Sequence, residues 1–319
     1  MATLLAEHNI PLAFAKHLNK EIPKIFDDSK VAQRFSFAAT KTTCMINGAI
    51  APHFLKETVE TIKESPFSLL TDGSNDTGLE KMNPLTVRIF DIRNQKVESR
   101  FLDMCATTGK DAATAATIFD KINEVLEKHE IPWGNCVGFG VDNTNVNVGT
   151  RNSIMTRVKQ KNDACYFMGC PCHLLHNIAC KASESFSDTT EFNLEDICID
   201  VYYYFDKSSK RKSLLDEYAE FCEIDYRQII KHVNTRWLRV ETVVRRNLDM
   251  YPALKSYFLS TSESTTRFKR LKKQFRDPMV EVYHLFYQAV LPTFTVINKF
   301  LQREDPCIYA AHEQLHDFV

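Results

Sequence analysis

The sequence predicts an α/β fold in which a mixed sheet with flanking helices is followed by an all-helical region. Apolar residues recur at helical spacing over residues 10–62, strand-like and helical segments alternate over residues 66–186, and helical spacing returns from residue 194 onward. We therefore expect an N-terminal helical region at 1–65, an α/β core at 66–186 and a helical region at 187–319.

The expected elements of the core follow a recognisable order. A short strand opens at Phe67 and ends in the polar segment 71–76. The later elements expected are strands at 85–92 and 97–104, a helix at 111–129, a strand at 136–141, a helix at 153–161, a strand at 165–168 and a helix from about residue 173. Three antiparallel strands followed by alternating helices and strands give a mixed sheet, and this order is found in ribonuclease-H-like domains.

Composition narrows the range of functions. Forty basic and forty-one acidic residues give a net charge of −1, which excludes a uniformly basic nucleic-acid coat, so any such binding must come from local clusters of charge. Nine glycines and the absence of a glycine-rich phosphate-binding motif argue against a nucleotide-loop function. No apolar run reaches the roughly 18 residues of a membrane helix, and no membrane partner is expected.

Two aspartates are distinguished by where they stand in the predicted sheet. Asp72 follows the first strand and Asp142 follows the fourth, and these strands are expected to be neighbours whose carboxyl ends meet at the ligand-binding edge of an open α/β sheet. Adjacent carboxylates attract a divalent cation, so Mg²⁺ or Mn²⁺ is the expected metal and phosphoryl transfer its chemistry. The alternative is that each aspartate only forms a turn or caps a helix.

A cysteine- and histidine-rich segment follows the last strand of the core. Cys170 and His173 have the spacing of metal ligands, but no second pair at zinc-finger spacing follows, so a zinc site is not expected. The alternative, a polar start to a helix, is preferred for this segment.

Together with these motifs, the chain resembles the transposase core of the hAT superfamily, particularly its domesticated and BED-zinc-finger-associated relatives. The segments that carry the resemblance are AEHNIPLAFAKHL (6–18), FSLLTDGSND (67–76), GFGVDNTNVNVG (138–149), GCPCHLLHNIA (169–179), NTRWLRV (234–240) and LQREDP (301–306). They span nearly the whole chain in the order found in the family.

The resemblance implies a ribonuclease-H-like fold that is interrupted after its fifth strand by a helical insertion region. It also implies catalysis by two aspartates and a glutamate that hold divalent metal for DNA hydrolysis and strand transfer, with Asp72 and Asp142 matching the two aspartates. Cys170 and His173 match a family motif near the active site. Trp237 matches a position at which the family handles flipped or hairpin DNA, although ordinary helix packing is an equal alternative.

The resemblance is incomplete at the carboxyl end. The glutamate of the family belongs to a closing segment with a dimerisation motif, and nothing of that kind precedes Val319; Glu304 and Glu313 stand in a different context. We therefore expect a C-terminally incomplete, transposon-derived protein that binds nucleic acid without a full catalytic triad. The alternatives are an active metal-dependent transposase seen as a fragment, and a protein-interaction module. Any homo-oligomer is expected to form through the missing segment.

Basic clusters supply the expected contacts with DNA. The segment 267–276 holds six cations and no acid, and its apolar residues Phe268, Leu271 and Phe275 fall on a separate face. The residues expected to contact nucleic acid are Arg236, Trp237, Lys269, Arg270, Lys272, Lys273 and Arg276. The alternative is a solvated lysine-rich face. Together with the resemblance, short basic runs predict a nuclear protein, with a cytoplasmic one as the alternative.

Overall fold

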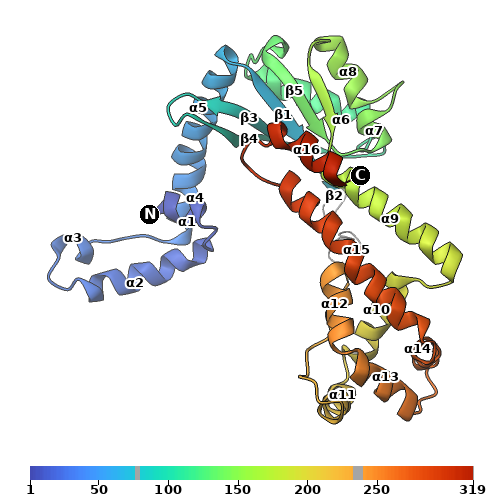
Figure 1. Cartoon of the computed structure of the whole chain (residues 1–319). Helices are drawn as coiled ribbons and strands as arrows, with labels where there is room; N and C mark the ends of the chain where they lie inside the picture. Colours follow the sequence, from blue (N-terminus) through green and yellow to red (C-terminus); the bar gives the residue numbers. More distant parts are fainter. Residues whose placement is uncertain (76–79, 233–239, 319) are drawn as a thin grey trace. The chain divides into compact units, whose positions relative to one another are not determined.

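The computed structural model describes residues 1–75, 80–232 and 240–318, and the chain divides into two compact units, Met1–Gly169 and Cys170–Val319. The first unit contains the N-terminal helices and the sheet, and the second is helical (Figure 1). The predicted fold class is therefore confirmed, whereas the domain boundaries at 65/66 and 186/187 stay predictions. None of the described helices combines the length and the apolar character needed to cross a bilayer.

Short helices precede the sheet. They are α1 (Ala2–Glu7), η1 (Leu12–Phe14), α2 (Ala15–Ile25), α3 (Lys30–Gln33), α4 (Ala39–Met45), the π-helical η2 (Ile46–Ile50) and α5 (Ala51–Glu64). Helix α5 begins with a proline in its first turn, where the missing N–H costs nothing, and it buries Val59 and Ile62. The side chain of Asn135 donates to the carbonyl oxygens of Ile62 (3.3 Å) and Lys63 (2.7 Å), which satisfies acceptors that the end of a helix leaves open.

The sheet is mixed. Its strands are β1 (Phe67–Thr71), β2 (Ser74–Asn75), β3 (Lys81–Asp91), β4 (Lys96–Thr107), β5 (Cys136–Val141) and β6 (Tyr166–Gly169). Strand β3 pairs antiparallel with β4 and with β1, and β1, β5 and β6 pair in parallel (Figure 1). The order β4–β3–β1–β5–β6 confirms the predicted order, with β1 and β5 as neighbours at the centre.

The core of the first unit lies on one face of this sheet. Leu69, Val87 and Phe139 are buried there, because alternate residues of a strand point to the same side. The helices that follow the strands are α6 (Ala115–Lys128), η3 (Trp133–Asn135), α7 (Asn145–Val148) and α8 (Ile154–Lys161). Buried residues of α5, α6 and α8 complete this core.

The opposite face of the sheet is different in character. Its side chains alternate with the buried ones, and several are apolar and exposed, among them Leu70, Phe90, Phe101, Tyr166 and Met168. The sheet is therefore buried on one face and solvent-accessible on the other in the described part of the chain.

The second unit is built of helices. They are α9 (Pro171–Thr190), α10 (Leu194–Phe205), α11 (Ser209–Phe221), α12 (Val240–Asp249), α13 (Tyr251–Ser260), α14 (Thr266–Arg276), α15 (Met279–Leu301) and α16 (Ile308–Phe318). Residues 187–190 are the last turn of α9, which stops where Glu191 takes a left-handed conformation (φ 57°).

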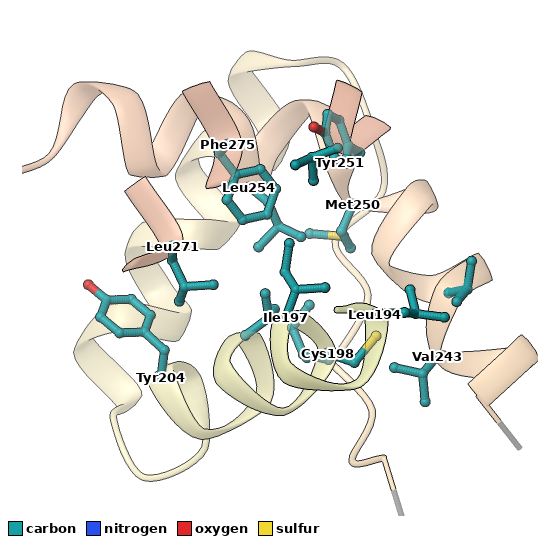
Figure 2. Packing of buried hydrophobic residues seen from close by; sticks show 14 of the residues in the cluster. Leu194, Ile197, Cys198, Tyr204, Val243, Met250, Tyr251, Leu254, Leu271 and Phe275 are labelled. Atoms are coloured by element: carbon teal, nitrogen blue, oxygen red, sulfur yellow. The ribbon is translucent and has the colours of Figure 1, made fainter. Parts of the chain in front are cut away.

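Helix α10 is the centre of the helical core. Figure 2 shows Ile197 of α10 near Leu254 of α13 and near Leu271 and Phe275 of α14, and it shows Cys198 on the side of Val243 of α12. All of these residues are at most 3% exposed. The apolar side of α14 is therefore held firmly by the core, and this fixes which of its residues reach solvent.

Candidate functional site

The two aspartates singled out in the sequence lie at matching positions of neighbouring parallel strands. Leu70 of β1 is the register partner of Gly140 of β5. Continuing that register by two residues aligns Asp72 with Asp142, just beyond the ends of the strands. Neighbouring strands lie roughly 4.8 Å apart, so the backbones of the two residues are neighbours. The predicted adjacency of the two strands is confirmed, whereas a catalytic or metal-binding role for the aspartates stays a prediction.

Both carboxylates belong to the same side of the sheet. By alternation, Asp72 continues the side of Leu70 and Asp142 continues the side of Gly140, which is the face away from the core. Asp72 is exposed and Asp142 is half-buried. The pair is thus accessible to a solute from solvent, at the carboxyl ends of the central strands where open α/β sheets bind ligands.

A local hydrogen-bond network fixes Asp142. Its Oδ1 atom accepts hydrogen bonds from the backbone N–H of Thr144 (3.0 Å), from the hydroxyl of Thr144 (2.7 Å) and from the side-chain amide of Asn147 (2.6 Å). These bonds shape the turn between β5 and α7, as the turn-forming alternative requires. They also hold the carboxylate in one orientation, which a ligand-binding role requires.

The backbone around Asp72 is supported by β3. Strands β1 and β2 follow one antiparallel register on β3, since Thr71 pairs with Leu85 and Ser74 with Met82. The same register sets Asp72 opposite Pro84, which has no N–H to donate, and this explains why the ladder is interrupted there.

Position 73 has no room for a side chain, because side chains of β3 lie close to its backbone. A Cβ atom at this position would lie 2.7 Å from Oδ1 of Asn83 and 2.9 Å from Cε of Lys81. Asn83 is 2% exposed and donates to the carbonyl oxygen of Cys105 (3.0 Å), so it is not free to move away. The glycine after the first aspartate therefore lets the Asp72 segment lie against the β3–β4 hairpin.

A second glycine stands at the end of β6. Gly169 is the register partner of Val141, and a Cβ atom on it would lie 1.9 Å from Oδ1 of Asn143. The side chain of Asn143 therefore occupies the space over Gly169, beside the Asp142 turn. Sequence reasoning did not identify this contact, because only the parallel pairing of β5 with β6 brings the two residues together.

The cysteine–histidine segment starts α9, as the preferred interpretation expected. Cys170 is the N-cap residue of α9 and His173 is exposed in its first turn. Burial, followed by the neighbouring thiol of Cys170, raises the pKa of Cys172 to about 11. Further along the helix, Sγ of Cys180 lies 3.7 Å from Nε2 of His176.

Among the residues that the structure describes, no three His, Cys, Asp or Glu side chains come together in a way that would hold a metal ion. The pair Asp72 and Asp142 would be enough for Mg²⁺ or Mn²⁺, which needs fewer protein ligands. Such an ion takes one or two carboxylates and fills its remaining positions with water or phosphate oxygens.

The basic helix of the second unit has the two faces that its sequence predicts. Phe268, Leu271 and Phe275 are 1%, 1% and 2% exposed, and they anchor α14 in the helical core. Lys269 and Lys273 are exposed on the outer side. Arg276 is also exposed, whereas the amine of Lys272 is half-buried and donates to the carbonyl oxygen of Thr261 (2.7 Å).

Two arginines of α14 are engaged within the unit. Nε of Arg267 lies 3.0 Å from the carboxylate of Asp200 in α10, and Arg270 binds the same carboxylate through Nε (2.8 Å) and Nη2 (2.7 Å). Asp200 is only 8% exposed. Arg270, one of the predicted DNA contacts, is therefore paired with a buried acid. Among the described residues, no protein acceptor binds Lys269, Lys273 or Arg276, the remaining cations of α14.

Arg236 and Trp237 were also predicted to contact nucleic acid. They lie in residues 233–239, outside the described part of the chain, so their predicted role stays a prediction.

The strand order, the paired strand-end aspartates and the one-sided core define the class of the first unit as a ribonuclease-like α/β domain. Residues 11–149 match the family model described as "ZMYM1/FAM200, RNase-like domain", a range that includes both Asp72 and Asp142. This match is consistent with a transposase-derived, domesticated protein. Comparison with curated proteins and with solved structures found no match.

Proposed function

We propose that this chain is a transposon-derived, hAT-like protein of the nucleus that binds DNA and does not carry a complete catalytic triad. The observation that carries the proposal is the charge pattern of α14, whose buried aromatic and leucine side chains orient Lys269, Lys273 and Arg276 outward. The ribonuclease-like core of the first unit supports the assignment to transposon-derived proteins.

The positive charge is concentrated on α14 itself. This helix has no acidic residue between Thr266 and Arg276, and Asp200, the acid that binds it within the described part of the chain, already accepts hydrogen bonds from Arg267 and Arg270. The outward cations therefore face solvent without an acidic neighbour on their own helix. A helix of this kind suits sequence-independent contact with phosphates, because such contacts need only positive charge at a suitable spacing.

Fluorescence anisotropy with a labelled DNA duplex tests this proposal. The triple variant Lys269→Gln, Lys273→Gln, Arg276→Gln should bind more weakly than the natural chain. Each lost phosphate contact should reduce the affinity by up to roughly eightfold at 0.1 M salt, from a dependence of about 0.9 counterions per contact.

A matched control removes three positive charges from helices other than α14. Lys56, Lys121 and Lys181 are exposed lysines on α5, α6 and α9, and their joint replacement by glutamine also removes three positive charges. This control should bind DNA like the natural chain. Equal losses in both variants would show that net charge, not α14, governs binding, and an absence of DNA binding by the natural chain would refute the proposal.

The alignment of Asp72 with Asp142 favours a second candidate, metal-dependent phosphoryl transfer. In this role the two carboxylates would hold Mg²⁺ or Mn²⁺, with Asp142 fixed by Thr144 and Asn147. When bound, such an ion activates a water or a 3′-hydroxyl and stabilises the leaving oxygen. The residues of the chain would supply the orientation of the carboxylates and the access from solvent.

A cleavage assay separates the two candidates. Strand cleavage of DNA in Mn²⁺ or Mg²⁺ that is lost in both Asp72→Asn and Asp142→Asn would establish the enzyme. DNA that stays intact while it is bound would support the binding protein. Asn keeps the size of Asp and can still accept a hydrogen bond from Thr144, so the variants should stay folded.

A further inference from the structure

We propose that α15 forms a homodimer by packing antiparallel against α15 of a second copy of this chain. The helix has two apolar faces. One contains Val280, His284, Tyr287 and Leu291, all at most 4% exposed, and packs within its own unit. The other is largely exposed to solvent, with the ring of Phe286 stacked on Phe186 of α9 (centroids 5.0 Å apart), and this second face is the interaction surface.

The exposed face has the spacing of a coiled-coil seam. Val282, Phe286, Ala289, Thr293 and Val296 follow one another at intervals of four, three, four and three residues. Val282, Phe286 and Val296 are 50%, 45% and 61% exposed, and the flanking side chains of Met279, Leu285 and Val290 are also exposed. An amphipathic helix at a solvated surface would present polar residues on this side instead.

Charge is absent from the face and present at both of its ends. Between Glu281 and Lys299 the only titratable side chains are the tyrosines and His284, and His284 is 1% exposed. A second copy of the same uncharged stripe matches it without leaving a charge unpaired. A partner surface rich in charged groups would leave some of them desolvated.

The end charges select the antiparallel arrangement. Glu281 and Lys299 are 18 residues apart (299 − 281), which is five turns of 3.6 residues, so they lie on the same side of α15. In an antiparallel pair, Glu281 of one copy meets Lys299 of the other at both ends. A parallel pair would bring like charges together. Within its own chain, Glu281 has Lys255 at 3.8 Å, and its side chain is still 45% exposed.

The sizes of the side chains that face each other also fit the antiparallel arrangement. With the stripe centred on Ala289, Val282 of one copy lies against Val296 of the other, Phe286 lies beside Thr293, and the two Ala289 side chains face each other. The small residues at the middle let the helices approach closely, and the large ones fill the space on either side. The sequence predicts self-association through a segment missing from this chain, whereas this surface lies within the described residues.

Sedimentation velocity over about 1 to 100 µM tests the proposal with the full chain. The natural chain should sediment as a concentration-dependent dimer, and Val282→Asp with Val296→Asp should weaken dimerisation at least tenfold. Both positions are exposed, so the helical content by circular dichroism should not change. Lys299→Glu and Glu281→Lys should each weaken the dimer, and the double exchange should restore it.

The outcomes that would overturn the proposal are distinct. A chain that stays monomeric over the whole range would show that something other than a second copy covers the face, such as another part of the same chain or a different protein. A dimer that survives the aspartate substitutions would place the interface elsewhere. A dimer in which the double charge exchange fails to restore what each single exchange loses would exclude the antiparallel arrangement.

Discussion

Replacing Asp200 by asparagine should weaken the anchoring of α14 and strengthen its attraction for DNA at the same time. The carboxylate accepts three N–H donors from Arg267 and Arg270 at 2.7–3.0 Å. Asparagine keeps the volume but loses the charge, and its amide N–H₂ group would face guanidinium donors. Two cations that now share one carboxylate would then be free to interact with phosphates.

The size of the destabilisation follows from exposure. Hydrogen bonds to charged groups contribute about 1.5–3 kcal/mol each when they are buried. Here the Asp200 side chain is 12% exposed, but those of Arg267 and Arg270 are 41% and 60% exposed, so solvent screens much of the attraction. We expect a loss of about 1–2 kcal/mol in total, which is roughly a 5- to 30-fold rise in the opening equilibrium of α14.

Hydrogen exchange of the amides of α14 measures this loss locally, and DNA anisotropy measures the second effect. Asp249→Asn is the matched control, because it breaks the exposed Arg227–Asp249 pair (3.0 Å) and should change protection little. Unchanged protection of α14 in Asp200→Asn would refute the anchoring role. Weaker DNA binding by a variant that stays folded would refute the view that Asp200 neutralises part of the basic helix.

Three further predictions concern the rest of the structure. Phe258→Ala, at 0% exposure in the helical core, should lower the free energy of unfolding by about 3–5 kcal/mol in denaturant titrations. Gly169→Ala should lower it by about 1–3 kcal/mol, because the new Cβ would lie 1.9 Å from Oδ1 of Asn143, whereas Gly48→Ala, with no atom within 4 Å, should not destabilise. Burial lowers the pKa of His284, so the folded state disfavours its charged form; stability is therefore unaffected above the ordinary histidine pKa and declines as pH falls below it, by up to about 1.4 kcal/mol per pH unit. His284→Asn should flatten that part of the stability–pH curve, and an unchanged curve would contradict the assignment.

Much of the first unit follows from local sequence. Strand β5 is observed at Cys136–Val141, the range predicted from its apolar run, and the order of strands and helices leaves few ways to build the sheet. That order places β1 beside β5, and the adjacency of Asp72 and Asp142 follows from it. The hydrophobic pattern and the topology rules were sufficient for the first unit, because each strand has its own run of apolar residues and is followed by turn-forming residues.

The parts that sequence could not supply depend on contacts between distant residues. Asp200 precedes Arg267 by 67 residues and Arg270 by 70, and no local pattern links them. Asn143 meets Gly169 only because β5 and β6 are parallel neighbours. The second apolar face of α15 is visible in the sequence only as general hydrophobicity, since burial alone shows which half of its apolar residues the core uses.

The salt dependence of DNA affinity tests the proposed function most directly. A plot of the logarithm of the binding constant against the logarithm of salt concentration should have a negative slope that reports the number of phosphates contacted. Replacing Lys269, Lys273 and Arg276 by glutamine should make that slope less steep by about 2.7, which is about 0.9 for each lost contact. A slope that is the same in the natural chain and the triple variant would contradict the proposal that α14 binds DNA.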